Sequence, residues 1–162
     1  MKFILLLSVL FPCYCFSQSV QELDNQNGYE DLKFDMPIDS ILIKTKAKKS
    51  AFQATDEATT YDVENKKYKK IGKLSAEITI VEFNRDSSLA SFFFTMDKYN
   101  KNEYTYLASY FTALYGKPTK EDDVQNIYQW RGRKVMIILS YSDKLKRVDF
   151  DILNLVEREK WL

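Results

Sequence analysis

The chain has 162 residues, with 24 basic and 23 acidic side chains, a formal net charge of +1 and no histidine. A near-neutral chain without a clustered positive excess is not expected to bind nucleic acid or an anionic membrane surface. The lack of histidine excludes Ser-His-Asp and Cys-His nucleophile systems and the common histidine-containing zinc sites.

The first 17 residues have the pattern of a cleaved signal peptide. Lys2 precedes an apolar run over residues 3–11, and Cys15 and Ser17 supply the small residues of a cleavage site, so we expect the mature chain to begin at Gln18. The run is shorter than the roughly 20 residues of a membrane-spanning helix. We therefore expect an exported protein, periplasmic or extracellular, that is not transmembrane.

Two alternatives for this segment stay open. It could form a buried N-terminal helix or strand, although Pro12 would interrupt either element. It could instead carry a lipid anchor on one of its cysteines, although its neighbouring residues are bulky for an acylation signal. Because Cys13 and Cys15 are the only cysteines, cleavage would leave a mature chain without a disulfide or a thiol.

The domain is expected to begin after a polar leader. Residues 18–31 are rich in Gln, Asn, Asp and Glu and show no apolar period, which predicts an extended leader open to disorder. One domain is then expected over residues 32–162. Pro37 and Asp39 favour a helix N-terminus, and apolar side chains three and four residues apart predict a short helix over residues 37–44.

Three strands are predicted next. Residues 46–58 show no period and are expected to form a loop, followed by a short strand over residues 60–63. Alternating apolar side chains predict a longer strand over residues 75–83. Residues 84–87 supply turn residues before another strand over residues 89–96, so these two strands are expected to form a hairpin.

The strongest helix signal lies in residues 102–115. Apolar and aromatic side chains recur there at intervals of three and four and predict one core-facing stripe, made of Tyr104, Leu107, Ala108, Phe111, Leu114 and Tyr115. Gly116 suits a left-handed helix cap, and Pro118 prevents the helix from continuing. We expect this helix to pack along the sheet.

The C-terminal part predicts three further strands, over residues 125–131, 134–141 and 145–153. Gly132 and Arg133 are expected to form a two-residue hairpin loop in which the glycine takes the strained backbone position. Residues 154–162 are expected to form a terminal helical turn. The pattern as a whole predicts a two-layer α+β domain with an antiparallel sheet of about six strands, two main helices on one side and a tandem order of helix followed by three strands.

Two stretches resemble known exported proteins. Residues 32–41 resemble the opening of many small exported bacterial proteins, in which a short strand, a Gly-Met pair and a short helix begin the domain; Asp35 stands where that pattern has Gly. Residues 114–118, Leu-Tyr-Gly-Lys-Pro, followed by Trp130, a hairpin and a last strand, are similar to β-lactamase-inhibitor-like and outer-membrane-assembly lipoprotein folds. The anchor cysteine of those lipoproteins has no counterpart. The resemblance implies this fold, export and a protein-binding role.

Carboxylates offer the remaining candidates for chemistry. Asp149 and Asp151 project from one face of a predicted strand, about 7 Å apart by strand geometry, which is compatible with a hydrolytic carboxylate pair. The alternative is a solvent-facing stripe with Arg147, which we favour. Residues 121–123 form an acidic run that could attract Ca²⁺ weakly, but without a recognised loop a charged surface loop is the simpler interpretation. We expect no catalytic residue, metal site or cofactor.

The aromatic side chains suggest a binding surface instead. Phe92, Phe93 and Phe94 are consecutive, so a strand places rings on both of its faces. We expect Phe93 to share a patch with Tyr128 and Trp130, and Tyr106 and Tyr110 to lie off the core stripe of their helix, as anchors for a protein partner. The alternative is that a loop, such as residues 46–58, covers this face.

Three functional hypotheses follow. The first is an exported, non-catalytic module that binds a protein partner or acts as an inhibitor. The second is a protein that holds a small apolar ligand in a cavity. The third is a carboxylate-dependent hydrolase built on Asp149 and Asp151, which the missing histidine and thiol make the weakest of the three.

Overall fold

The computed structural model describes residues 19–51 and 58–159. The predicted signal peptide of residues 1–17 and the predicted mature N-terminus at Gln18 lie outside these ranges, as does part of the predicted loop over residues 46–58. No helix within the described ranges is long and apolar enough to cross a membrane.

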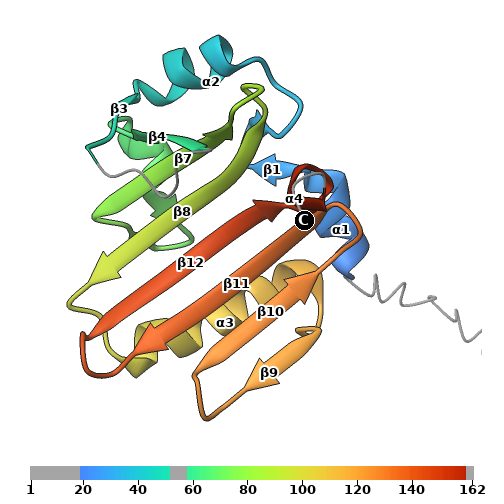
Figure 1. Cartoon of the computed structure of the whole chain (residues 1–162). Coiled ribbons are helices and arrows are strands. Elements are labelled where there is room, and N and C mark those ends of the chain that lie inside the picture. Colours follow the sequence, from blue (N-terminus) through green and yellow to red (C-terminus); the bar gives the residue numbers. More distant parts are fainter. Residues whose placement is uncertain (1–18, 52–57, 160–162) are drawn as a thin grey trace, which may run out of the picture.

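An antiparallel sheet of eight strands forms the centre of the molecule (Figure 1). The strands follow the order β3-β4-β7-β8-β12-β11-β10-β9. Their bounds are β3 Lys48–Lys49, β4 Ala58–Asp62, β7 Ile78–Asn84, β8 Leu89–Asp97, β9 Lys120–Asp122, β10 Ile127–Arg131, β11 Val135–Ser142 and β12 Arg147–Asn154. The six predicted strands are present, and the sheet is wider because the two edge strands, β3 and β9, are short and charged and show no apolar alternation.

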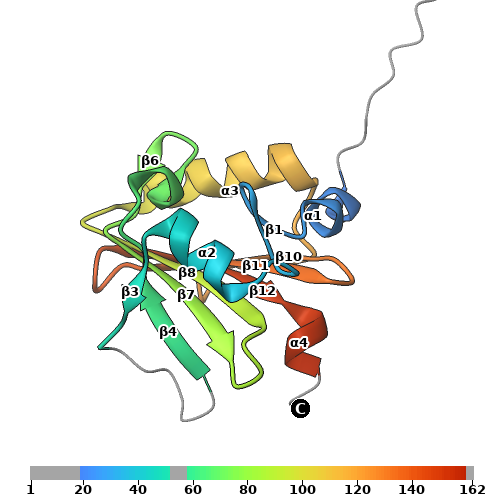
Figure 2. The ribbon, with the colours of Figure 1, turned by 90° about the horizontal axis from the view of Figure 1, so that it is seen from above.

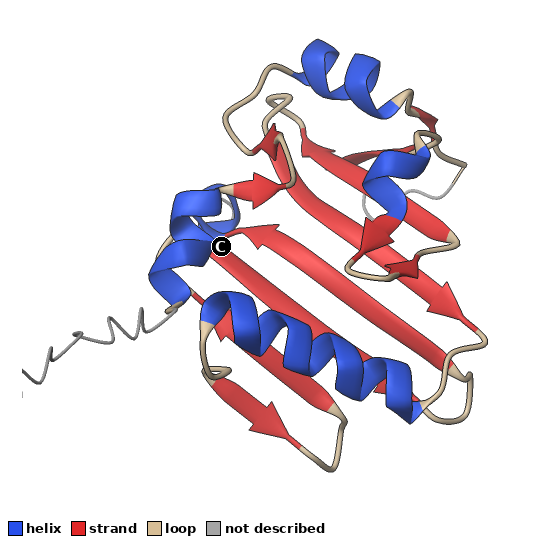
Figure 3. Cartoon of the chain, turned by 180° about the vertical axis from the view of Figure 1, so that it is seen from behind, coloured by secondary structure: helices blue, strands red, loops and turns tan. Residues whose placement is uncertain are grey.

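The helices lie on both faces of the sheet. They are α1 Val20–Gln26, α2 Ile38–Thr45, α3 Lys101–Tyr115 and α4 Leu155–Glu159, with a 3₁₀ helix, η1, at Lys66–Lys69. Figures 2 and 3 show α1 and α3 on one face, whereas α4 lies on the opposite face. There Leu155 of α4 packs against Met136 and Leu153 of the sheet.

Two small hairpins lie on the α3 side of the main sheet (Figure 3). The first consists of β1 Gly28–Tyr29 and β2 Leu32–Lys33, and the second of β5 Lys70–Ile71 and β6 Leu74–Ser75. Tyr29, Leu32 and Ile71 are buried in the main core. Both hairpins therefore belong to the layer that covers this face.

The two halves of the chain meet at the centre of the sheet. Strand β8 ends the first half, β12 is the last strand of the second, and the two pair antiparallel. Phe94 stands opposite Phe150 in this pairing, and their rings stack with centroids 4.8 Å apart. Each half runs from a helix, α2 or α3, into strands of the sheet, so the order is one helix followed by four main-sheet strands in each half.

Helix α3 confirms the predicted helix over residues 102–115. Tyr104, Leu107 and Phe111 are buried in the core, whereas Leu114 is 37% exposed, so the buried stripe ends one turn before the helix does. Gly116 ends the helix with a φ of 79° and a ψ of −167°. The glycine therefore has the positive φ that was expected, but in an extended rather than a left-handed helical conformation.

The predicted polar leader is wrong, because residues 20–33 belong to the folded domain. Ser19 caps α1, and Leu23 on this helix is completely buried. The carboxylate of Asp24, 6% exposed, accepts hydrogen bonds from the backbone N–H groups of Arg133, Lys134 and Val135 at 2.8, 2.8 and 3.1 Å. This carboxylate holds α1 on the loop between β10 and β11.

Gly132 has a different role from the one predicted. It is not among the residues with positive φ, and the loop between β10 and β11 spans three residues rather than two. A Cβ atom at Gly132 would lie 2.2 Å from Oδ1 of Asp24. Glycine is therefore needed here because it has no side chain to block the close approach of α1, and not because the loop requires an unusual backbone conformation.

Candidate functional site

The five aromatic residues predicted to form a binding surface do not lie together. Phe93 is half-buried on β8, between Ile80 of β7 and Asp151 of β12. Its neighbours Phe92 and Phe94 belong to the core under α3, so Phe93 points to the other face of the sheet. The predicted patch is thus divided by the sheet itself.

Trp130 and Tyr128 lie on the α3 side. Trp130 is completely buried, its indole N–H donates to the carbonyl of Gly116 at 3.0 Å, and its ring meets Phe111 edge-on with centroids 5.5 Å apart. Tyr128 is half-buried and stacks on Tyr104 with centroids 5.5 Å apart. Trp130 is therefore a core residue, and the prediction that it anchors an exposed patch is wrong.

Tyr106 and Tyr110 lie on α3, off its buried stripe as predicted. Their rings stack with centroids 6.2 Å apart. The hydroxyl of Tyr106 accepts a hydrogen bond from the backbone N–H of Lys73 at 3.1 Å, and the ammonium of Lys73 lies 4.3 Å from the centre of the Tyr106 ring. Tyr106 therefore attaches the β5–β6 hairpin to α3, whereas Tyr110 lines a cavity.

The carboxylate pair on β12 is largely occupied by its neighbours. Oδ1 of Asp149 accepts a hydrogen bond from the Thr95 hydroxyl, and Oδ2 accepts one from Nε of Arg147, both at 2.8 Å. Asp149 therefore pairs with Arg147 as the alternative expected, but its side chain is only 17% exposed and does not face solvent freely. In the described ranges, no group of three or more acidic or cysteine side chains is arranged to hold a metal ion.

A cavity of about 320 Å³ opens on the α3 side of the sheet. Its floor consists of core side chains of β11 and β12, namely Ile137, Phe150 and Ile152. One wall is formed by α3, through Tyr110, Phe111, Leu114 and Tyr115. The cavity therefore reaches from the surface to the most buried layer of the protein.

The opposite wall comes from the N-terminal segment and the two small hairpins. Gln26, Gly28, Tyr29 and Glu30 contribute from α1 and the β1–β2 hairpin, and Lys70 and Ile71 contribute from β5. The Tyr29 hydroxyl donates to the carbonyl of Lys70 and so joins the two hairpins across this wall. The ring of Tyr29 packs against Phe92 and Phe94 of the core.

Three tyrosine hydroxyls and the carboxylate of Glu30 contribute to the polar part of the cavity lining. Burial, followed by the negative charge of Glu30, raises the pKa of Tyr29 and of Tyr110. Burial, followed by Tyr110 and Glu30, raises the pKa of Tyr115 to about 12. All three hydroxyls are thus neutral near pH 7 and lie within electrostatic reach of Glu30.

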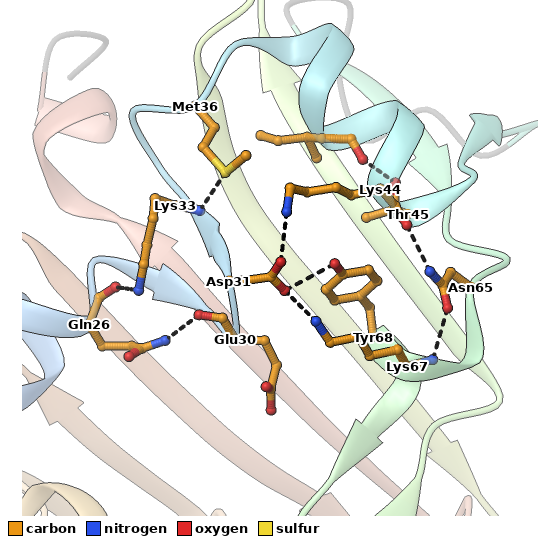
Figure 4. A network of polar contacts seen from close by, with 11 residues as sticks. Gln26, Glu30, Asp31, Lys33, Met36, Lys44, Thr45, Asn65, Lys67 and Tyr68 are labelled. Atoms are coloured by element: carbon orange, nitrogen blue, oxygen red, sulfur yellow. Dashed lines mark hydrogen bonds and ion pairs between the residues drawn. The ribbon is translucent and has the colours of Figure 1, made fainter.

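The turn that carries Glu30 is held by the next residue. Figure 4 shows Asp31 at the centre of a cluster, with Nζ of Lys44 and of Lys67 each 2.7 Å from its carboxylate and the Tyr68 hydroxyl at 3.0 Å. Hydrogen bonds from Lys44 and then Lys67 hold the pKa of Asp31 well below its usual value. These contacts tie the β1–β2 turn to α2 and η1.

Of the cavity residues, only Tyr110 is among those predicted from the sequence to bind a partner. The two-residue strands of the small hairpins show no alternation, and residues 18–31 lack an apolar period, so the wall containing Tyr29 and Glu30 left no pattern to detect. The isolated pair Gly28-Tyr29 in a polar stretch was the only local signal. Comparison with protein-family models, curated proteins and solved structures finds no match to this chain.

Proposed function

We propose that this protein is a non-catalytic binding protein that holds a small ligand with an apolar body in the cavity beside α3. One observation carries the proposal: a cavity of about 320 Å³ is open to the surface and floored by core residues. That size lies at the lower end of the roughly 300–1,000 Å³ that small-molecule sites occupy. The apolar floor favours an apolar ligand body, and the hydroxyls supply the few polar groups that orient it.

The other hypotheses have less support. The aromatic patch proposed for a protein partner is divided between the two faces of the sheet, and Trp130 is buried. The two carboxylates of the hydrolase hypothesis, Asp149 and Asp151, do not line the cavity, and both oxygens of Asp149 accept hydrogen bonds from its neighbours. We retain export as part of the proposal on the pattern of residues 1–17.

Binding of a neutral aromatic dye tests the cavity directly. We expect N-phenyl-1-naphthylamine to bind saturably at one site per chain, with the rise in fluorescence that follows transfer to an apolar environment. Leu114→Trp places a large ring in the cavity wall and is expected to weaken dye binding at least tenfold.

Ala113→Trp provides the matched control. Ala113 is the exposed neighbour of Leu114 and does not line the cavity, so this variant should bind the dye as the wild type does. Equal dye binding by the two tryptophan variants would place the dye elsewhere and contradict the proposed function.

A further inference from the structure

Resting on the proposed function, we infer that the ligand carries a cationic amino group, which pairs with Glu30 while its apolar body lies on the floor of the cavity. The inference stands on the position of Glu30 in the cavity wall, on the uncompensated charge of its carboxylate and on the aromatic rings around it.

Glu30 is the acidic residue of the cavity wall. Its backbone carbonyl accepts a hydrogen bond from Nε2 of Gln26 at 2.7 Å, which fixes the turn, but within the described ranges its carboxylate has neither a hydrogen bond nor an ion pair. In Figure 4 the side chain of Glu30 points away from the Asp31 cluster. Lys44 and Lys67 pair with Asp31, and the exposed carboxylate of Glu30 is left to solvent.

Two lysines of the neighbouring segments are engaged in contacts of their own. Nζ of Lys33 donates to the backbone carbonyl of Gln26 at 2.6 Å, and Lys73 lies over the ring of Tyr106. Lys70 of β5 lines the cavity, where its backbone carbonyl accepts a hydrogen bond from the Tyr29 hydroxyl, and alternation with the buried Ile71 places its side chain on the exposed side of the strand. A cationic ligand would supply the charge that these lysines do not.

Aromatic rings favour the same ligand charge. Tyr29, Tyr110, Phe111 and Tyr115 all line the cavity, and the face of an aromatic ring attracts an ammonium group within about 6 Å of its centre. The neutral hydroxyls of Tyr110 and Tyr115 have oxygen lone pairs that can accept hydrogen bonds from an ammonium group. An anionic ligand would meet the like charge of Glu30 in the cavity wall.

The backbone at Glu30 is consistent with a functional role for its side chain. Its φ is 53°, in the left-handed region that glycine adopts most readily. Glycine would suit this turn better than glutamate does. We therefore expect Glu30→Gly to fold at least as stably as the wild type, so that a loss of binding in this variant reports on the carboxylate and not on the fold.

Three probes with the same indole body separate charge from shape. Tryptamine carries an ammonium group, tryptophol a hydroxyl and indole-3-propionate a carboxylate at the end of a two-carbon chain. Calorimetric titration of the full chain is expected to rank them in this order, with tryptamine at least tenfold tighter than tryptophol. In Glu30→Gln and Glu30→Gly the preference for tryptamine over tryptophol should fall to about twofold or less.

The outcomes distinguish the two proposals. Equal affinity for tryptamine and tryptophol in the wild type, or a preference for tryptamine that survives Glu30→Gln, would overturn the inference and leave the cavity as a neutral binding site. If Leu114→Trp blocks neither the dye nor any of the probes, the cavity itself is not the site, and the proposed function fails with the inference.

Discussion

The centre of the sheet and helix α1 are both buried, but different interactions hold them. At the centre, the ring of Phe150 lies 4.8 Å from those of Phe94 and Phe111, measured between centroids, in a continuous apolar core. Helix α1 is short and polar and contributes Leu23 to that core, and its one buried carboxylate, Asp24, accepts hydrogen bonds from the backbone N–H groups of residues 133–135, at the end of the loop and the start of β11.

The two regions therefore differ in how far they tolerate the loss of one side chain. Apolar packing spreads over many neighbours, so truncating one ring leaves the others in place while lowering the stability of the whole domain. The three N–H groups that Asp24 accepts depend on one side chain, and buried donors without a partner are costly. We therefore expect global effects at the centre of the sheet and local effects at α1.

The largest effect is expected from Phe150→Ala. Phe150 is completely buried at the pairing of β8 with β12, and its truncation should lower the free energy of unfolding by about 3–5 kcal/mol. Urea denaturation followed by circular dichroism measures this loss. Ile43→Ala is the control, since Ile43 is 77% exposed on α2 and should change little. A comparable loss in the two variants would mean that the centre of the sheet is not the main source of stability.

Asp24→Ala should cost less and act more locally. We expect a loss of about 1–3 kcal/mol, because backbone donors of residues 133–135 lose their acceptor. Hydrogen exchange should accelerate in residues 20–26 far more than in β8 or β12. Asn25→Ala, at an exposed neighbouring position, is the control. Uniform acceleration across the domain would remove the distinction between the two regions.

Gly132→Ala checks the same contact from the other side. The added Cβ would lie 2.2 Å from Oδ1 of Asp24 and displace it. The stability losses of Asp24→Ala and Gly132→Ala should therefore be strongly non-additive, and the double variant should be about as stable as the less stable of the two single variants. Additive losses would show that Gly132 serves the loop and not α1.

Alkaline pH is expected to lower stability through Tyr115, which lines the cavity between α1 and the centre of the sheet. Tyr115, with a pKa raised to about 12 by burial, is neutral when folded and ionises near pH 10 when unfolded. Its contribution to stability is therefore complete below pH 10 and is lost as the pH rises from 10 towards 12. Tyrosinate absorbance of the folded protein should show a late titration, and Tyr115→Phe should reduce its amplitude by the share of one tyrosine, since Tyr29 and Tyr104 also have raised pKa values. A titration complete by pH 10 would contradict the burial of this hydroxyl.

The smallest effect is expected at Asp31. Its lowered pKa means that the stabilisation by Lys44 and Lys67 is present at neutral pH and is lost as the pH falls below 3.8, the ordinary value for Asp. Asp31→Asn should lower the urea midpoint slightly at pH 7, since its contacts are solvent-exposed and screened, and by less at pH 2. Asp35→Asn, at an exposed carboxylate outside the helices and strands, is the control. A deficit of Asp31→Asn that is as large at pH 2 as at pH 7 would show that charge is not its cause.

The predictable parts of the molecule are those whose signal is local. The stripe from Tyr104 to Phe111 predicted α3, and alternation of apolar side chains predicted β7. Alternation along β8 also places the side chains of Phe92 and Phe93 on opposite faces of the sheet. Which ring shares a face with Trp130, however, depends on the register from Trp130 through Ile137 and Ile152 to Phe92, which only the folded sheet defines.

Helix α1 and the cavity could not be predicted, for a related reason. The partners of Asp24 lie 109 to 111 residues further along the chain, so the stretch around it read as polar and structureless. The cavity wall depends on hairpins whose strands have two residues each, too short to show a period. Both features arise from contacts between distant segments, which composition and periodicity do not contain.

Because β12 lies at the centre of the sheet and late in the chain, the sheet can form only near the end of synthesis. Strand β12 joins residues 91–97 of β8 to β11, so the two halves of the sheet stay unconnected until the last strand of the chain is available. During synthesis, β8 presents an open edge beside Phe92 and Phe94. A chain that stops before residue 147 keeps that edge and is expected to aggregate. Pairing of β12 is therefore the last step in forming the sheet. A chaperone that delays folding until the whole chain has been released would protect this protein more than it would protect a protein whose strands pair in chain order.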